Sequence, residues 1–220
     1  DWIARHTPDG ARITVTDVTS GWAVLGVFGP KAREVVGPLT DADLSNTAFP
    51  FGTLQEIDLG YARSIAVRRT YMGELGWELY VPTEFAVGAF DALWASGESM
   101  GLVLAGYHAM NSLRMEKAYR HWGDDIGDED TPIEAGLAWG VAFNKPGGFI
   151  GREALLAQKE TGPTRRLVQF RLEDPEPLIY HDEPVYRDGN LVGRITSGMY
   201  GHTVGSALGM AYVGCDSDTP

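Results

Sequence analysis

The sequence contains a single cysteine, Cys215, and this scarcity excludes several kinds of structural support. One cysteine cannot form an internal disulfide, and no thiolate cluster is present to hold zinc or an iron–sulfur group. No run approaches the ~18 continuous apolar residues of a membrane-spanning helix, and no basic-then-apolar leader opens the chain. These absences favour a soluble intracellular protein.

Basic residues are also few, with 18 Lys and Arg against 30 Asp and Glu and a formal net charge of −12. This balance argues against a general binder of nucleic acid or of anionic membranes, although a local basic surface such as Arg68-Arg69 or Arg165-Arg166 remains compatible with it. No G-x-G-x-x-G and no G-x-x-x-x-G-K-[ST] is present. The chain therefore encodes neither a Rossmann dinucleotide site nor the common phosphate cradle.

No metal site is expected. The five histidines show no tight ligand spacing, and the acidic run at 124–130 departs from the calcium-loop pattern at Ile126 and Ile133. We expect this run to form a solvated loop. Its carboxylates are expected to cap or to pair with the neighbouring cations Arg114, Lys117 and Arg120.

Twenty-eight glycines without a repeat period indicate many tight turns between short strands. Asp1–His6 resembles the tail of a helix, and Ile13 and Val15 alternate with polar residues as in a half-buried strand. A buried strand is predicted at 21–28, followed by a helix from Pro30 to about Val36. Further strands are predicted at 53–59, 62–70 and 77–81, and a second long helix at 106–121.

The helix that follows 77–81 has Thr83 as its expected cap. Its Val87, Phe90 and Trp94 fall on one apolar stripe, which we expect to face the core. From Arg165 the pattern is all strand, with a hairpin joining 184–187 to 191–196 through a three-residue loop at 188–190.

These patterns predict an α+β fold of antiparallel sheets with helices packed on them, in ferredoxin-like units, followed by a small β-barrel or Greek-key domain. The predicted domains are an α+β body at 1–164, with room for two intertwined subdomains, and a barrel portion at 165–220. The few strands after 165 suggest that the barrel is incomplete here.

The most informative segment is Tyr71–Val81, which reads Y-M-G-E-L-G-W-E-L-Y-V. Two glycines form a tight loop into a strand, along which Trp77, Leu79 and Val81 point one way and Glu78 the other. From spacing alone, we would expect Glu78 to face solvent. Trp77 is expected to be a core residue, and Glu74 is expected to have a structural role in the loop.

Y-x-G-E-x-G-[WF]-E resembles the signature of the glycine cleavage T-protein (aminomethyltransferase) folate-binding family, whose domain also forms the C-terminal part of dimethylglycine and sarcosine dehydrogenases. Further segments agree in order and spacing with that family across most of the chain. These are residues 15–30, 112–117 with 122–125, 131–137, 149–155 and 193–198.

The resemblance implies that Glu78 recognises the pterin ring of tetrahydrofolate and that Tyr71 lines the same pocket. Met110 and Asn111 stand where the glycine-cleavage branch carries an arginine–aspartate pair, which disfavours ordinary aminomethyltransferase activity. The ending Glu116–Arg120 and the variant G-E-L-G-W-E-L of the motif resemble the dimethylglycine/sarcosine dehydrogenase branch. An iron–sulfur accessory role is disfavoured, because Gly147 stands where that branch has its cysteine.

The implied function is that of the tetrahydrofolate-binding domain of such an enzyme, which traps an iminium or formaldehyde carbon as 5,10-methylenetetrahydrofolate. The alternatives are an aminomethyltransferase of the glycine cleavage system, a folate-dependent demethylase and a non-catalytic folate-binding module. By resemblance, the catalytic aspartate and an FAD-binding domain lie upstream of Asp1, so no catalytic residue is assigned here and this segment alone is expected to be inactive. The expected partners are folate, a one-carbon unit from a small N-methyl amino acid and that flavin domain in cis. The expected compartment is the cytoplasm, or the mitochondrial matrix in a eukaryote.

Overall fold

The computed structural model describes residues 2–215, and these divide into two compact units. Unit 1 comprises the described residues up to Thr70 together with Glu74–Val103. Unit 2 comprises Tyr71–Gly73 together with the described residues from Leu104 onward. Three residues of unit 2, Tyr71–Gly73, thus lie in the sequence between the two segments of unit 1. The domain boundary predicted between residues 164 and 165 does not coincide with the boundary between these two units, and it stays a prediction.

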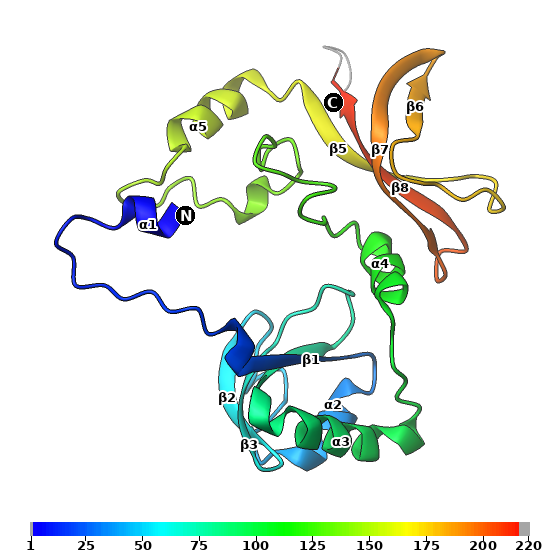
Figure 1. Cartoon of the computed structure of the whole chain (residues 1–220). Helices are drawn as coiled ribbons and strands as arrows, with labels where there is room; N and C mark the ends of the chain where they lie inside the picture. Colours follow the sequence, from blue (N-terminus) through cyan, green and yellow to red (C-terminus); the bar gives the residue numbers. More distant parts are fainter. Residues whose placement is uncertain (1, 216–220) are drawn as a thin grey trace. The chain divides into compact units, whose positions relative to one another are not determined.

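Unit 1 is an α+β unit built on a four-stranded antiparallel sheet with strand order β1-β4-β3-β2 (Figure 1). Its helices and strands are α1 Trp2–His6, β1 Trp22–Phe28, α2 Ala32–Val36, β2 Leu54–Leu59, β3 Ala62–Val67, β4 Gly76–Pro82 and α3 Ala86–Gly97. Short 3₁₀ turns lie at Thr19–Gly21, Gly37–Leu39, Thr83–Phe85 and Glu98–Met100. The predicted helical tail at the start of the chain and the strands at 21–28, 53–59, 62–70 and 77–81 are confirmed, with ends that differ by at most three residues.

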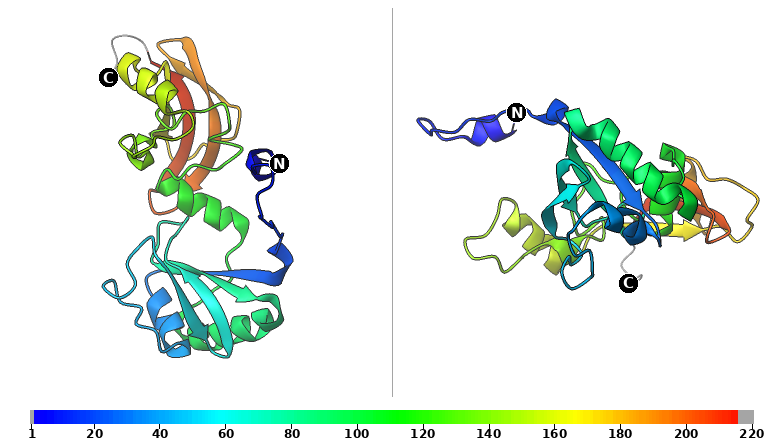
Figure 2. Two further views of the ribbon diagram at one scale, coloured as in Figure 1. Left: turned by 90° about the vertical axis from the view of Figure 1, so that its left-hand side faces the viewer. Right: turned by 90° about the horizontal axis from the view of Figure 1, so that it is seen from below.

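The alternation along β4 decides which face of the sheet is buried. Trp77, Leu79 and Val81 are all 0% exposed and pack in one core with the apolar residues of α2 and α3. Figure 2 shows these two helices on one face of the sheet. Because successive strand residues point to opposite faces, Glu78 and Tyr80 project from the face without these helices. The expectation that Trp77 is a core residue is confirmed.

Two expectations for unit 1 are wrong. Ile13 and Val15 do not form a strand; they are 58% and 66% exposed, and no described strand pairs with their segment. The apolar stripe of α3 does not face the core either, since Val87 is 75% exposed while Ala89 and Leu93 are buried.

The reason for the second error is that α3 has two rows at helical spacing. The row containing Ala89, Leu93 and Gly97 is built mostly of small residues, which allows the helix to approach the sheet closely. Thr83 does not cap the helix, because its hydroxyl donates to the carbonyl of Ser20 at 2.8 Å.

Unit 2 contains a second four-stranded antiparallel sheet, with order β5-β8-β7-β6. Its elements are α4 Tyr107–Glu116, the 3₁₀ turn Ala138–Gly140, α5 Arg152–Thr161, β5 Arg165–Arg171, β6 Pro184–Arg187, β7 Asn190–Gly201 and β8 Ser206–Gly214. Helix α4 packs on β7 and β8, where Met115 is fully buried against Leu208 and Met210. The all-strand pattern predicted after Arg165 is confirmed, and the helix predicted at 106–121 ends at Glu116.

The β6–β7 hairpin has a shorter loop than expected. Arg187 pairs with Asn190, so the loop consists of Asp188 and Gly189 alone, with φ of 52° and 81°. Positive φ at both central positions is typical of a type I′ turn, whose twist matches that of the flanking strands. The three-residue loop predicted at 188–190 is therefore wrong by one residue.

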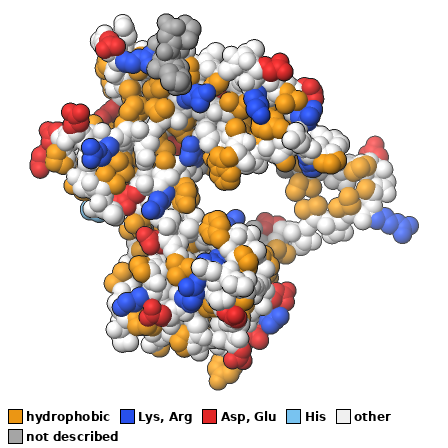
Figure 3. All heavy atoms as spheres, turned by 180° about the vertical axis from the view of Figure 1, so that it is seen from behind, with side chains coloured by type: hydrophobic (Ala, Val, Ile, Leu, Met, Phe, Trp, Pro, Cys, Tyr) orange, Lys and Arg blue, Asp and Glu red, His pale blue; other side chains and the backbone are white. Residues whose placement is uncertain are grey.

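Among the described residues, no helix is long and apolar enough to cross a membrane. On the face drawn in Figure 3, basic side chains are interspersed with acidic ones. That face therefore carries no uniformly basic surface.

Candidate functional site

Glu78 lies in the middle of β4, between two strands that pair with it. Gly26 of β1 stands opposite Glu78 on one side and Val67 of β3 on the other. The side chain of Glu78 is 21% exposed, on the sheet face opposite the buried Trp77 and Leu79. A carboxylate is thus presented from a rigid central strand instead of from a loop.

Two polar partners fix the orientation of this carboxylate. Its Oε2 accepts a hydrogen bond from Arg69 Nε at 2.9 Å and another from the hydroxyl of Tyr80 at 3.1 Å. The bond with Glu78 is the main cause that raises the pKa of Arg69 above its ordinary value. Both bonds use the same oxygen, so neither of them involves Oε1.

Besides these polar partners, aromatic and alkyl groups lie near Glu78. A Cβ atom at Gly26 would lie 2.7 Å from the Phe28 ring, so that ring folds back over the glycine beside Glu78. Tyr80 and Val67 lie on the same face by strand alternation and register. A flat donor-bearing heterocycle would find an acceptor there together with ring and alkyl surface.

The two glycines of the Gly73-Glu74-Leu75-Gly76 turn have different physical roles. Gly73 has a φ of 75°, which a residue with a side chain rarely adopts. Gly76 opens β4, where a Cβ would lie 2.1 Å from the carbonyl oxygen of Val27. The motif therefore sets the chain direction first and then allows β4 to approach β1 closely.

Tyr71, the second predicted folate residue, belongs to unit 2. Its hydroxyl donates to the carbonyl of Arg120 at 3.0 Å, and its ring stacks on Tyr119 with centroids 6.2 Å apart. Burial is the main cause that raises the pKa of Tyr71. Glu78 and Tyr71 thus fall in different units, and each is held by residues of its own unit.

The basic pairs considered as anion-binding surfaces have other partners. Arg68 is buried, bonds to the carbonyl of Phe49 and to Asn46, and lies over the Trp77 ring. Arg69 is bound to Glu78. Arg165 forms ion pairs with Asp130 and Glu134 at 2.9 and 3.5 Å. Three of the four arginines considered for a local basic surface are therefore already engaged by groups of this chain.

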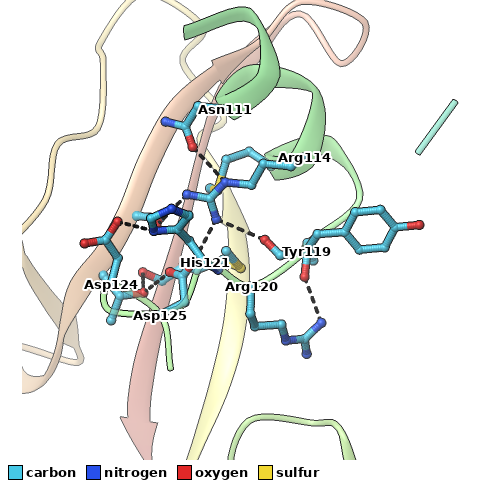
Figure 4. Close-up of polar contacts among 12 residues, drawn as sticks. Asn111, Arg114, Tyr119, Arg120, His121, Asp124 and Asp125 are labelled. Carbon is cyan, nitrogen blue, oxygen red and sulfur yellow. Dashed lines mark hydrogen bonds and ion pairs between the residues drawn. The ribbon is translucent and has the colours of Figure 1, made fainter. Parts of the chain in front are cut away.

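Unit 2 contains a second polar centre, around Arg114 of α4 (Figure 4). Arg114 donates through Nη1 to Asp125 at 2.6 Å, through Nε to Asn111 at 2.7 Å and through Nη2 to Ser197 at 2.8 Å. A further bond from Nη1 reaches the carbonyl of Tyr119 at 3.0 Å. These contacts occupy each nitrogen of the guanidinium.

Asp125 is saturated in the same way. Besides Arg114, it accepts from the backbone N–H of His121 at 2.9 Å and from the hydroxyl of Thr196 at 2.6 Å. Asp125 is 0% exposed, so the expectation of a wholly solvated acidic loop is wrong at this position. The predicted pairing of the loop with Arg114 is confirmed, whereas the side chain of Arg120 donates to the carbonyls of Ala118 and Ala135.

The two centres differ in how much of each could be predicted from the sequence. Tyr80 could be placed beside Glu78 from the two-residue period of β4, but Arg69 required the β3–β4 register. The Arg114–Asp125 pair joins α4 to a loop, and Asn111 and Ser197 complete it from two other places in the sequence. No local pattern brings those four residues together.

Comparison with known proteins gives two family matches. The model of the GCVT N-terminal domain matches residues 1–145, and that of the glycine cleavage T-protein C-terminal barrel domain matches residues 165–219. The chain is 48% identical over 95% of its length to 4-methylaminobutanoate oxidase (formaldehyde-forming) of Paenarthrobacter nicotinovorans, and 38% identical over 96% of its length to human mitochondrial dimethylglycine dehydrogenase. It spans 25% of the length of each of these two relatives.

Shorter relatives match as well. An aminomethyltransferase of Halothermothrix orenii is 36% identical over the whole of this chain, which spans 60% of that protein. The crystal structure of glycine cleavage system aminomethyltransferase T from Bartonella henselae superposes with a TM-score of 0.76 at 29% identity. That match covers 88% of this chain and 52% of the other.

Proposed function

Because this chain belongs to the glycine cleavage T-protein family, we propose that unit 1 binds the pterin ring of tetrahydrofolate through Glu78. The larger enzyme would transfer a one-carbon unit from a small N-methyl amino acid to that folate. The names of its relatives support this class of reaction, since they include a formaldehyde-forming methylaminobutanoate oxidase and a dimethylglycine dehydrogenase. The predicted membership in this family and the predicted relation to dehydrogenases are confirmed. The one-carbon transfer is our proposal.

The observation that carries the proposal is the orientation of the Glu78 carboxylate. A pterin presents a ring N–H next to an exocyclic amine, and a carboxylate can accept both in a charge-assisted bidentate arrangement. Glu78 pairs with Arg69, and its Oε1 is used by neither of the two bonds that hold Oε2. The carboxylate therefore supplies an acceptor suited to the donors of the heterocycle.

The aromatic side chains around this carboxylate supply the second part of the proposed site. The Phe28 ring beside Gly26 offers apolar surface next to Glu78, and ring stacking contributes about 0.5–1.5 kcal/mol beyond buried area. We assign Tyr71 to the same ligand, as the family motif implies. Its ring is stacked on Tyr119 within unit 2.

The roles of this chain are then binding and orientation. Bound tetrahydrofolate supplies the nitrogen that captures the one-carbon unit, while Glu78 sets the direction of the ring and the apolar neighbours exclude water. The sequence carries no dinucleotide-binding G-x-G-x-x-G motif. By resemblance to the dehydrogenase relatives, we propose that the flavin and the catalytic aspartate belong to parts of the enzyme outside this chain, and we expect this chain alone to give no turnover. We place the enzyme in the cytoplasm, or in the mitochondrial matrix of a eukaryote.

The aminomethyltransferase of the glycine cleavage system is the second candidate. The match to the Bartonella henselae protein over 88% of this chain supports it. Against it stands Asn111, which occupies the place of the family's aspartate and accepts a bond from Arg114. The dehydrogenase type of activity remains our proposal.

Isothermal titration of tetrahydrofolate into the full chain tests the proposal. Replacing Glu78 by Gln removes the charge and one acceptor, so Glu78→Gln should weaken binding about tenfold, or about 1.4 kcal/mol. The matched control is Glu56→Gln, since Glu56 is also a strand glutamate that pairs with an arginine but is largely exposed. Equal affinity of Glu78→Gln and the parent chain, or a parent chain that does not bind, would contradict the proposal.

A further inference from the structure

Arg69 places a group of hydrogen-bond donors beside the carboxylate of Glu78. Strand β3 ends at Val67, which stands opposite Glu78 in the β3–β4 register. The backbone N–H of Arg69 donates to the carbonyl of Val67 at 3.0 Å, so the chain turns immediately after the strand. Arg68 lies over the ring of the buried Trp77, whereas the side chain of Arg69 reaches Glu78. The two consecutive arginines thus serve opposite faces of the sheet.

Only part of the donor capacity of Arg69 is used within the chain. Its Nε donates to Glu78 Oε2 at 2.9 Å, and its Nη2 lies 3.4 Å from the hydroxyl of Tyr80. Among the residues that the structure describes, none accepts from Nη1. A guanidinium has five N–H donors, and the side chain of Arg69 is 57% exposed. Donors of Arg69 are therefore available to a ligand that binds Glu78.

The hydrogen-bonding edge of a pterin has a third group next to its two donors. The exocyclic amine at C2 and the N–H at N3 donate, and the carbonyl at C4 follows them as an acceptor. A carboxylate that accepts from the amine and from N3 leaves this carbonyl beyond one of its oxygens, where it needs a donor. Oε2 of Glu78 is the oxygen to which Arg69 is bound. The donors of Arg69 thus lie on that side of the carboxylate.

The two orientations of the ring against Glu78 are therefore unequal. With N3 at Oε2, the C4 carbonyl meets the guanidinium of Arg69 and accepts a charge-assisted hydrogen bond. With the amine at Oε2, the second N–H of the amine faces the same guanidinium, so that donor meets donor. A pterin with an amine at C4 presents a donor to Arg69 in the first orientation as well. Glu78 and Arg69 together match a ring that carries an oxygen at C4.

We propose that Arg69 determines the specificity of the pterin site by donating to the C4 carbonyl of the ring, and so selects 4-oxo over 4-amino pterins. This inference rests on the proposed binding of tetrahydrofolate at Glu78. It adds a residue outside the family motif, because that motif begins at Tyr71. Specificity is a difference of affinities. Here the bond to the carbonyl favours the 4-oxo ring, and the contact between donors disfavours the 4-amino ring.

The test is isothermal titration of the full chain with tetrahydrofolate and with its 4-amino counterpart, which differ only in the substituent at C4. The parent chain should prefer tetrahydrofolate. Arg69→Met keeps a long side chain without donors, and it should reduce this preference about tenfold by weakening tetrahydrofolate more than the 4-amino ligand. The matched control is Arg63→Met, since Arg63 also pairs with a strand glutamate, Glu56, at 3.1 Å. This control should keep the preference of the parent.

The ratio of the two affinities separates selection of the ligand from support of Glu78. If Arg69 only held Glu78 in place, Arg69→Met would weaken both ligands by the same factor, and an unchanged ratio overturns the inference. A parent chain without a preference for tetrahydrofolate overturns it too. Glu78→Gln reports the pterin site independently. A tenfold loss in Glu78→Gln with an unchanged ratio in Arg69→Met removes this inference alone, whereas a parent chain that binds neither ligand removes the proposed function as well.

Discussion

Arg114 and Asp125 form an ion pair of 2.6 Å in which the two side chains are only 3% and 0% exposed. Asn111, Ser197 and Thr196 provide hydrogen bonds to its two members. The pair thus connects α4 and the loop after it with β7. A buried pair of this kind tolerates the loss of one member poorly, because the remaining charge stays away from water.

We therefore expect Arg114→Met to lower the free energy of unfolding of unit 2 by about 3–5 kcal/mol. Urea unfolding followed by circular dichroism measures the loss, and amide hydrogen exchange in β7 and β8 assigns it to unit 2. The control is Arg63→Met, whose pairs with Glu56 and Asp58 are more than 60% exposed. Such pairs contribute about 0–1 kcal/mol, and similar losses in both variants would show that the buried pair has no special weight.

Replacing two glycines of unit 1 by alanine should change the unfolding free energy in opposite directions. A methyl group at Gly76 would lie 2.1 Å from the carbonyl oxygen of Val27, so β4 would have to move away from β1. Gly76→Ala should therefore lower the unfolding free energy by about 1–3 kcal/mol. Gly88 lies within α3 with open space around its Cα, and Gly88→Ala should raise stability by about 0.5–1 kcal/mol.

Thermal and urea unfolding of the two alanine variants, side by side with the parent chain, check this pair. A stable Gly76→Ala protein would mean that the close approach of β1 and β4 is not required. A loss in Gly88→Ala would mean that this part of α3 is covered.

Tyr212 of β8 gives a prediction at alkaline pH. Burial, followed by the nearby Asp130 carboxylate, raises the pKa of Tyr212 well above its ordinary value. The unfolded chain releases this proton at about pH 10. The stabilisation is therefore fully present below that pH and is lost as the pH rises above it, because ionisation then favours the unfolded state.

Tyr212→Phe removes this contribution, so the unfolding free energy of the variant should fall less steeply than that of the parent between about pH 9 and about pH 11. For one proton the difference in slope approaches ~1.4 kcal/mol per pH unit. Tyr61→Phe is the control, since Tyr61 is fully exposed. Parallel curves for Tyr212→Phe and the parent would contradict the assignment.

The strands of unit 1 were predictable because their signal is local. The two-residue period of β4 assigns Trp77 and Leu79 to one face and Glu78 to the other, and short turn segments such as Gly60-Tyr61 separate β2 from β3. The motif around Glu78 also led to the family through its residue spacing. These features depend on neighbours within a few positions, which the chain itself specifies.

The errors arose where two local solutions were equally compatible with the sequence. Helix α3 has one row with Val87 and Phe90 and another with Ala89 and Leu93, and both satisfy the helical period. Packing chose the second row, since small residues bring the helix nearer to the sheet. Ile13 and Val15 likewise had a strand pattern, but a strand also needs a partner.

By itself, the sequence determined the strands of unit 1, the glycine turn that leads into β4 and the face of β4 from which Glu78 projects. It also determined the family. Only the tertiary structure decided that Asp125 is buried with Arg114 and that Arg69 holds Glu78. The physical reason is that period and turn chemistry act between neighbours, whereas desolvation and ion pairing act between groups that only folding brings together.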